Sequence, residues 1–253
     1  MSFIKTFSGK HFYYDRINKD DIVINDIAVS LSNICRFAGH LSHFYSVAQH
    51  AVLCSQLVPQ EFAFEALMHD ATEAYCQDIP APLKRLLPDY KRMEEKIDAV
   101  IREKYGLPPV MSTPVKYADL IMLATERRDL GLDDGSFWPV LEGIPATEMF
   151  KVIPQAPGHA YGMFMERFNE FEAKCAAQEN KVIPVSAELP PANESVLLFD
   201  ANGEGWLIGW RSLWYTWEQK ETGEWQWTFQ VGDLENVNIT HWAIMPKAPE
   251  AGA

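Results

Sequence analysis

The sequence predicts an α+β protein, with an all-α N-terminal part over residues 1–180 and a small β-rich module over residues 181–253. Long segments before residue 180 have the apolar spacing of helices. After residue 180 the sequence changes to short β-branched and aromatic runs separated by turn residues, a pattern typical of strands. Tryptophan use changes at the same place, since seven of the eight tryptophans lie between Trp206 and Trp242. We place the boundary near residues 178–182.

The helices follow in chain order from apolar spacing and helix-ending residues. Asp26 can cap a first helix, a second is expected over about 42–57, and a third over about 59–76, ended by the prolines of "DIPAP". The amphipathic segments "DYKRMEEKIDAVIREKYG" and "TPVKYADLIMLATERRDLG" predict helices that close on Gly106 and Gly131. "HAYGMFMERFNEFEAKCAAQE" predicts the last long helix.

The remaining segments predict a surface excursion and a set of strands. "LDDGSFWPVLEGIPATEMFKVIPQAPG", between the last two helices, is rich in proline and glycine and predicts a long irregular loop. Beyond residue 180, "SVLLFDANGEGWLIGWR", "EWQWTFQVG" and "NITHWAIMP" predict strands, with a hairpin turn at "DANGEG".

Composition narrows the function classes. With 22 basic and 35 acidic residues the net charge is −13, which disfavours general nucleic-acid binding because a polyanion is repelled. The N-terminus has no apolar core of signal-peptide length, and no run approaches 18 apolar residues, so we expect neither a leader nor a membrane span. The four cysteines contain no CxxC pair, which indicates reduced thiols in a cytoplasmic protein.

Polar side chains interrupt the apolar run "ALMHDATEAY". If this segment is helical, His69, Asp70 and Glu73 share a broad face with Phe62 and Ala66. Burying three polar groups is costly unless each has a partner, so a polar stripe on a buried helix suggests a lined cavity. An "HD" dipeptide alone is weak evidence, because a hydrogen-bonded helix residue explains it equally well.

Two further features favour a metal site. In "TPVKYADLIML", Asp119 borders an apolar stripe, and in "GHLSHFYSVAQHA", His43 and His50 are seven residues apart and share a helical face. Each has a simpler explanation alone: a carboxylate at a helix end, or a histidine bonded to a carbonyl. Together they give His, then His-Asp, then Asp on three successive elements. Two imidazoles and two carboxylates form a ligand set for a divalent cation.

The order His43, His69-Asp70, Asp119 resembles the HD-domain metal-dependent phosphohydrolases. "SHFYSVAQHA", "MHDATEAYCQDIPAPLK" and "VKYADLIMLATERRDL" are similar to segments of bacterial 5′-deoxynucleotidases and of related phage deoxynucleotide phosphohydrolases. The resemblance covers about residues 6–130. The C-terminal part resembles a small uncharacterised phage-associated domain, which says nothing about chemistry.

The resemblance implies an all-α HD-domain helical bundle and one divalent ion, whose identity among Mn, Co, Zn, Fe and Mg stays open. The ligands it implies are His43, His69, Asp70 and Asp119. Glu73 matches the catalytic glutamate of the family, Asp78 an acid near the substrate sugar, and Arg36 an arginine that faces the nucleotide. It also implies a homo-oligomer, in the cytoplasm of a bacterium or of a phage-infected host.

The activity so implied is hydrolysis of the 5′-phosphate ester of a deoxyribonucleotide, from dNMP to deoxynucleoside and phosphate. An activated water would attack the phosphorus, with Glu73 as general base or acid. Arg36 and Lys84 would hold the outer phosphate oxygens. His40 and His50 lie outside the shared ligand set. Each of them is expected either to contact the substrate phosphate or to serve packing or support of the ligands.

Three alternatives remain. A dNTP triphosphohydrolase would use the same residues and release triphosphate. An alarmone hydrolase is disfavoured, because Ala74 follows Glu73 where those enzymes carry an acidic pair. A catalytically silent nucleotide sensor or adaptor would use the Trp-rich module as its binding surface. The retained Glu73 counts against silence, and in so small a module most tryptophans are expected to build the core.

Overall fold

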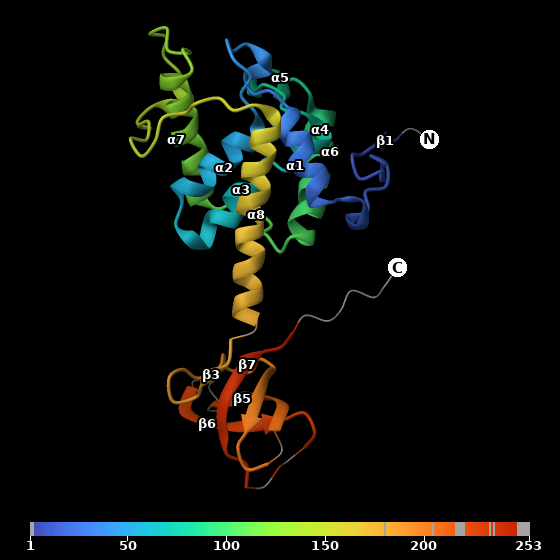
Figure 1. Ribbon diagram of the computed structural model, residues 1–253, viewed down its shortest axis with the longest axis vertical. Helices are drawn as coiled ribbons and strands as arrows, with labels where there is room; N and C mark the ends of the chain where they lie inside the picture. The colour runs from blue at the N-terminus through green and yellow to red at the C-terminus, as the bar shows by residue number, and fades with distance from the viewer. Residues whose placement is uncertain are drawn as a thin grey trace. The chain divides into compact units, whose positions relative to one another are not determined.

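The computed structural model describes residues 3–179, 181–203, 205–215, 221–232, 234 and 236–246. The described chain is α+β, as the sequence predicts, because a series of helices is followed by a five-stranded antiparallel sheet (Figure 1). The chain divides into two compact units, residues 1–171 and residues 172–253. This division falls inside the last helix, earlier than the 178–182 expected from the sequence.

The first unit begins with an antiparallel hairpin of β1 (Ile4–Lys5) and β2 (His11–Phe12) and continues as a series of helices. Its α-helices are α1 (Ile24–Asn33), α2 (Val47–Leu57), α3 (Ala63–Met68), α4 (Glu73–Cys76), α5 (Ala81–Lys84), α6 (Pro88–Lys104), α7 (Thr113–Asp129) and α8 (Pro157–Glu179). Single 3₁₀ turns are η1 (Lys19–Asp21), η2 (Phe37–Gly39), η3 (Gln60–Phe62) and η4 (Pro139–Leu141).

Helix α2 lies in the core of this unit. It is buried from Val47 to Ser55 and packs against α1, α3 and α7. Phe164 and Phe168 of α8 belong to the same hydrophobic core. No helix in the described part of the chain is both long and apolar enough to cross a bilayer. The position of α2 matters for function, because its neighbours α3 and α7 carry the other candidate site residues.

Two helix starts differ from the sequence prediction. Helix α2 begins at Val47 rather than near Ser42, because the Ser46 hydroxyl accepts a hydrogen bond from the first turn and caps the helix there. Asp26 does not cap α1, since it lies inside the first turn. Its carboxylate instead accepts hydrogen bonds from the backbone N–H and the hydroxyl of Ser8.

The helix expected over residues 59–76 is interrupted. It is divided into η3, α3 and α4, with a turn at residues 69–72 between the two α-helices. In this turn the backbone N–H groups of Ala71 and Glu73 donate to the carbonyls three residues earlier. Such 3₁₀-type bonds tighten the chain relative to an α-helix. His69 and Asp70 therefore lie in a tight turn rather than in mid-helix.

The later helices match the sequence prediction closely, since α6, α7 and α8 cover the three predicted segments. Between α7 and α8 the described chain is irregular apart from η4, which confirms the surface excursion. Arg128 and Asp129 attach it to α7: the Arg128 guanidinium donates to the Thr147 carbonyl, and the Asp129 carboxylate accepts from the Val152 N–H at 2.8 Å.

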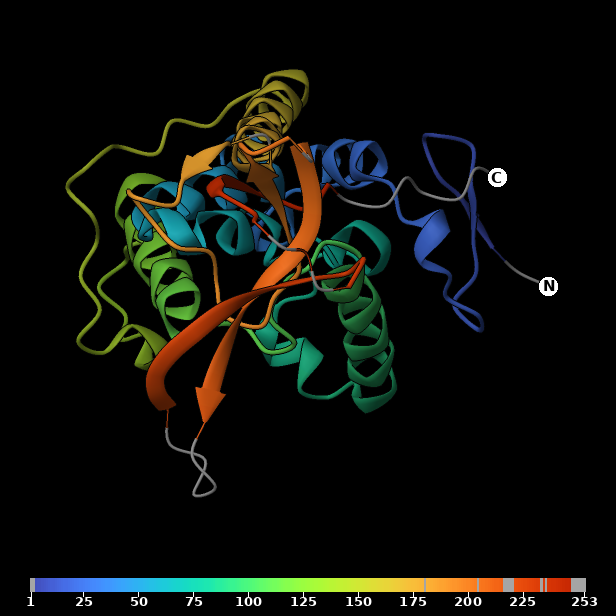
Figure 2. The same cartoon turned by 90° about the horizontal axis from the view of Figure 1, so that it is seen from below.

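The second unit contains a five-stranded antiparallel sheet in the order β3-β7-β4-β5-β6. Its strands are β3 (Ile183–Pro184), β4 (Val196–Asp200), β5 (Gly205–Tyr215), β6 (Glu221–Phe229) and β7 (Ile239–Ile244). Figure 2 shows β5 and β6 (orange to red) as long, twisted strands. β4 and β5 pair with Asp200 opposite Gly205, which confirms the hairpin at "DANGEG".

The tryptophans of this unit are less buried than predicted. Trp242 is in the sheet core with Leu198, but Trp206, Trp214 and Trp225 are 44%, 51% and 38% exposed. Side chains alternate between the two faces of a strand, so Trp206 and Trp214 lie on the face of β5 opposite to that of the core-packed residue at 207. The expectation that most tryptophans build the core is wrong for these three.

Candidate metal centre

Three neighbouring elements of the first unit bring ionisable side chains together. His50 comes from α2, His69 and Asp70 from the 69–72 turn, and Asp119 from α7. Asp119 follows the buried Ala118 on α7, at the edge of the face that packs against α2 and α3. Both histidines are buried, whereas Asp119 is partly exposed. The group therefore sits at the margin of the core, with a side open to solvent.

The four donor atoms surround one point. His50 Nε2 lies 3.2 Å from Asp119 Oδ1 and 3.7 Å from Asp70 Oδ2. His69 Nε2 lies 3.2 Å from Asp70 Oδ2 and 3.9 Å from Asp119 Oδ1. Atoms bound at about 2.1 Å to one ion are about 3.0–3.4 Å apart in octahedral or tetrahedral geometry. The spacing fits a single divalent cation.

The hydrogen bonds of His69 leave one nitrogen for such an ion. Its Nδ1 lies 2.8 Å from the Ala66 carbonyl, which can only accept, so Nδ1 carries the proton and Nε2 a lone pair. This Nε2 is buried and has no hydrogen-bond partner among the described residues. An unsatisfied buried polar atom is costly, and a bound cation would satisfy it. The residues present thus fit a metal ion.

His50 is oriented by a buried carboxylate. Its Nδ1 lies 2.6 Å from Glu126 Oε1, an arrangement that directs Nε2 toward Asp119. Glu126 also accepts hydrogen bonds from the Tyr45 hydroxyl at 2.9 Å and from Arg36 Nη2 at 3.1 Å. A carboxylate behind a metal-binding histidine sets the tautomer and orientation of the ring. Glu126 lies in this position behind His50 and can set the tautomer and orientation of its ring.

Mutual charges shift the pKa values of these groups. Burial alone would raise the pKa of the Asp70 carboxyl, but His69, His50 and Arg36 hold it well below its usual range. For Asp119, likewise, a hydrogen bond with His50 outweighs burial and lowers the pKa. Burial lowers the pKa of His69, yet the neighbouring Asp70 and Asp119 outweigh it and raise the pKa. The lowered pKa values therefore favour both carboxylates in the charged form that binds a cation.

The pKa of Glu73 is shifted in the opposite direction to the pKa values of Asp70 and Asp119. Burial and then the negative charges of Asp70 and Asp78 raise its pKa well above the ordinary value. Its Oε2 is buried without a hydrogen-bond partner in the part of the chain that the structure describes. A carboxyl with a raised pKa can hold a proton near neutral pH and deliver or accept it in a reaction. Asp78 is half-buried, and burial raises its pKa as well.

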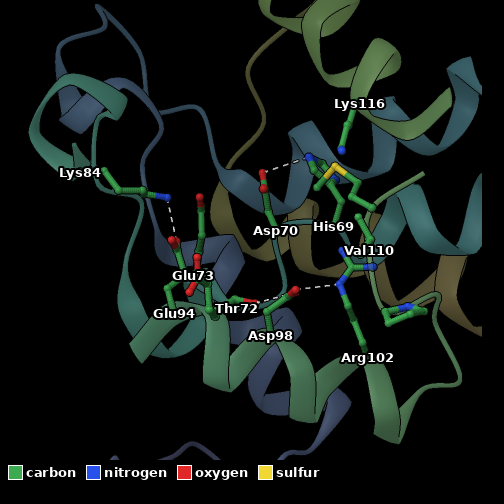
Figure 3. Close-up of a pocket in the computed structure, with 13 residues that line it drawn as sticks. His69, Asp70, Thr72, Glu73, Lys84, Glu94, Asp98, Arg102, Val110 and Lys116 are labelled. Atoms are coloured by element: carbon green, nitrogen blue, oxygen red, sulfur yellow. Dashed lines mark hydrogen bonds and ion pairs between the residues drawn. The ribbon is translucent and has the colours of Figure 1, made fainter. Parts of the chain in front are cut away.

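A cavity of about 490 Å³ opens beside the cluster, within the size range of small-molecule sites. Figure 3 shows His69, Asp70 and Glu73 on one side of it, with Lys84 and Lys116 approaching from different helices. Its wall combines acids and bases with an apolar edge; these residues include Glu94, Asp98, Arg102, Pro109, Val110 and Met111.

The structure does not bring His43 to this cluster, so its assignment as a ligand needs correction. His43 is exposed in the segment before α2 and lines different cavities, one of them with Asp129. The physical reason is the late start of α2, which leaves residue 43 outside the helix. His50, seven residues later, is within the helix and occupies the position that His43 was expected to fill.

The other expected residues are distributed around the cluster. Arg36 is nearly buried between Glu126 and Asp70, with Nη1 3.7 Å from Asp70 Oδ2. Lys84 lines the cavity, and its ammonium pairs with Glu94 at 2.7 Å. His40 is exposed just after η2 and is not among the residues that line the cavity or surround the four donor atoms.

Sequence reasoning missed three residues of the site, Glu126, Lys116 and Cys54. Glu126 follows Asp119 by seven positions on α7 and Lys116 precedes it by three, so helical spacing places all three near one face. Cys54 follows His50 by four positions on α2 and lies in the donor group. Helical spacing was the available signal for each of them. His50 itself was noted but assigned to substrate or packing, because the family resemblance implied His43 as the ligand.

Comparison with known proteins finds close relatives whose names state no activity. No protein-family model matches the chain. It is 95% identical over 178 residues to the uncharacterised protein YfdR of Escherichia coli K12, which covers 70% of this chain and 100% of YfdR. It is 89% identical over 89 residues to the uncharacterised protein YfdS of the same strain, covering 35% of this chain and 74% of YfdS. An uncharacterised Rhodobacter capsulatus protein is 32% identical over 108 residues, covering 39% of this chain and 55% of its own length.

Proposed function

The chain belongs to the family of YfdR and, over a shorter stretch, to that of YfdS, and from its candidate metal centre we propose that it is a metal-dependent phosphohydrolase acting on deoxyribonucleotides. One observation carries the proposal. The unpartnered Nε2 of His69 joins His50, Asp70 and Asp119 in a ring of donors that borders a cavity with cationic and acidic walls. This combination suits an anionic substrate that is activated by a cation.

His50, His69, Asp70 and Asp119 would hold the ion, with nitrogen and oxygen donors that suit Mn²⁺, Co²⁺, Zn²⁺ or Fe²⁺. When bound, a divalent ion would lower the pKa of a water molecule and neutralise charge on phosphoryl oxygens. Glu126 would keep the ring of His50 in the ligating tautomer. The chain thereby contributes a prepared set of donors.

Glu73 would handle the proton of the reaction. It lines the cavity one turn beyond His69, and burial together with Asp70 and Asp78 raises its pKa. A carboxyl that carries a proton near neutral pH can protonate the leaving 5′-oxygen, and the resulting carboxylate can take a proton from the incoming water. The same residue would thus serve as general acid and general base in turn.

The substrate phosphate would lie against cations of the cavity. Lys84 and Lys116 both line it, and Arg36 lies behind Asp70 at the edge of the cluster. Charge-assisted hydrogen bonds from such groups hold phosphate oxygens firmly. Asp78 would lie near the sugar and would select deoxyribose, as in the resembling 5′-deoxynucleotidases. A monophosphate is our first choice of substrate, and an intact triphosphate is the second.

The test is hydrolysis of a panel of dNMPs, NMPs and dNTPs with added divalent metals, with products separated by chromatography. Deoxynucleoside and orthophosphate from dNMPs would support the 5′-deoxynucleotidase, whereas triphosphate from dNTPs would move the protein to the triphosphohydrolases. The double variant His69→Ala, Asp70→Ala should be inactive. Tight nucleotide binding without product under any metal would contradict the enzyme and favour the sensor.

A further inference from the structure

Cys54 lies beside the donor atoms of the proposed metal centre. It is on α2, one turn after His50, and is fully buried. Its Sγ is 3.4 Å from His50 Nε2. The Sγ atom and the donor atoms of His50, His69 and Asp119 all lie within 4.8 Å of one another. No part of the sequence-based assignment involves this thiol.

These distances match those around a single tetrahedral ion. For metal–nitrogen bonds of about 2.1 Å and a metal–sulfur bond of about 2.3 Å, ligand atoms are about 3.4–3.6 Å apart. The observed separations are 3.4 Å between Cys54 Sγ and His50 Nε2 and 3.2 Å between His50 Nε2 and Asp119 Oδ1. The 3.9 Å from His69 Nε2 to Asp119 Oδ1 is longer. All separations in the group are within 4.8 Å, so binding of one ion would draw the four side chains closer together.

A second observation points to a ligand independently of the thiol. The side chain of His69 is 1% exposed, and its Nε2 has no hydrogen-bond partner among the described residues. Its nearest carboxylate oxygen, Asp70 Oδ2 at 3.2 Å, lies at the distance of a neighbouring ligand of one ion. An ion at the centre of the donor group would satisfy His69 and contact Cys54 at the same time.

We propose that Cys54 is a ligand of the metal, bound as thiolate on the buried side of His50, His69 and Asp119. This inference rests on the proposed metal centre. Asp70 lines the cavity, whereas Cys54 has no exposed surface. Binding converts the thiol and the divalent ion into a metal–thiolate bond and one proton, which leaves to solvent.

The consequence is a choice of metal. Thiolate is a soft donor that suits Zn²⁺, Co²⁺ and Fe²⁺, whereas Mg²⁺ prefers oxygen ligands. A centre with Cys54 would discriminate against Mg²⁺, which is the more abundant ion in cells. The bound metal would also protect this thiol from oxidation, because a coordinated sulfur is less free to react.

The experiment is absorption spectroscopy of the full chain titrated with Co²⁺. Visible d–d bands report that Co²⁺ is bound, and a near-ultraviolet sulfur-to-cobalt charge-transfer band reports a thiolate ligand. The test variant is Cys54→Val, which replaces the thiol at this buried position with an apolar side chain that cannot bind a metal. The matched control is Cys76→Val, the same change at a half-buried thiol outside the donor group. Cys54→Ala replaces Cys54→Val if the latter fails to fold.

We expect the charge-transfer band in the wild-type protein and in Cys76→Val, and its loss in Cys54→Val. Zinc affinity should fall at least about tenfold in Cys54→Val, since even outer-shell partners of ligands contribute that much. Visible bands without a charge-transfer band in the wild type would overturn the thiolate and leave the phosphohydrolase intact. No cobalt bands at all would overturn both proposals. A charge-transfer band in a protein that hydrolyses no nucleotide would support Cys54 and contradict the proposed function.

Discussion

Glu126 Oε1 lies 2.6 Å from His50 Nδ1, and neither side chain has any exposed surface. This contact connects the candidate metal centre to a buried network, because Glu126 also binds Tyr45 and Arg36. Arg36 in turn reaches Asp70 at 3.7 Å. Two donors on different elements, His50 and Asp70, are thus positioned through one carboxylate.

The first prediction concerns this carboxylate. Glu126→Gln should weaken Zn²⁺ binding by about 10–100-fold, because His50 loses its charged partner. It should also destabilise the metal-free protein by about 3–5 kcal/mol, because the buried Arg36 loses the closer of its two carboxylate partners. Metal titration and urea unfolding measure the two effects. Unchanged zinc affinity would show that Glu126 does not position His50.

The second prediction is the response of the metal-free protein to acid. Burial raises the pKa of Glu126, but Arg36 and His50 outweigh it, so the folded-state pKa is lowered. The stabilisation is therefore complete above the unfolded-state pKa of about 4.3 and is lost as the pH falls through the folded-state value. Urea unfolding from about pH 6 to about pH 2 should show a steeper loss of stability for wild type than for Glu126→Gln. Parallel curves for the two proteins would contradict the lowered pKa.

The third prediction separates proton transfer from metal binding. Glu73→Gln should lower kcat by about 10²–10⁴-fold, the usual contribution of a general acid or base. Metal content should stay at the wild-type level, because Glu73 is outside the ring of donors. If the group acts protonated, wild-type activity should decrease as the pH rises above its raised pKa. A variant that loses its metal together with its activity would place Glu73 among the ligands instead.

The fourth prediction tests the sheet of the second unit. A Cβ atom at Gly209 would lie 2.5 Å from the Thr228 carbonyl oxygen and 2.8 Å from Leu198 Cδ1, so β5 cannot accept a larger residue without moving its neighbours. Gly209→Ala should destabilise this unit by about 1–3 kcal/mol, the cost of overpacking. Thermal unfolding followed by tryptophan fluorescence measures it. An unchanged transition would mean that the sheet is packed more loosely at this point.

The sequence predicts the parts of the fold that local signals determine. Apolar periodicity with proline at the start and glycine after the end defines α6 and α7 closely. The predicted start of α2 was wrong because the capping Ser46 lies inside an apolar run that continues the helical pattern. His43 was assigned as the ligand from the family resemblance, and the observed helix start places His50 at the cluster instead.

Other features depend on contacts between distant residues. The strand order β3-β7-β4-β5-β6 places the last strand second in the sheet, and no local signal encodes such a crossover. The network of Arg36, Tyr45 and Glu126 joins residues up to 90 positions apart, so it emerges only when α7 packs against α2. The sequence contains Glu126, Arg36 and Tyr45, but it does not indicate that they lie close together.

The most direct test of the account compares two histidines in one assay. Metal-dependent hydrolysis of dNMPs should be abolished by His50→Ala, together with stoichiometric metal binding, because His50 contributes Nε2 to the donor ring. His43→Ala should retain both, because His43 is exposed and lines a different cavity. Loss of activity and metal in His43→Ala, with both retained in His50→Ala, would contradict the proposed centre.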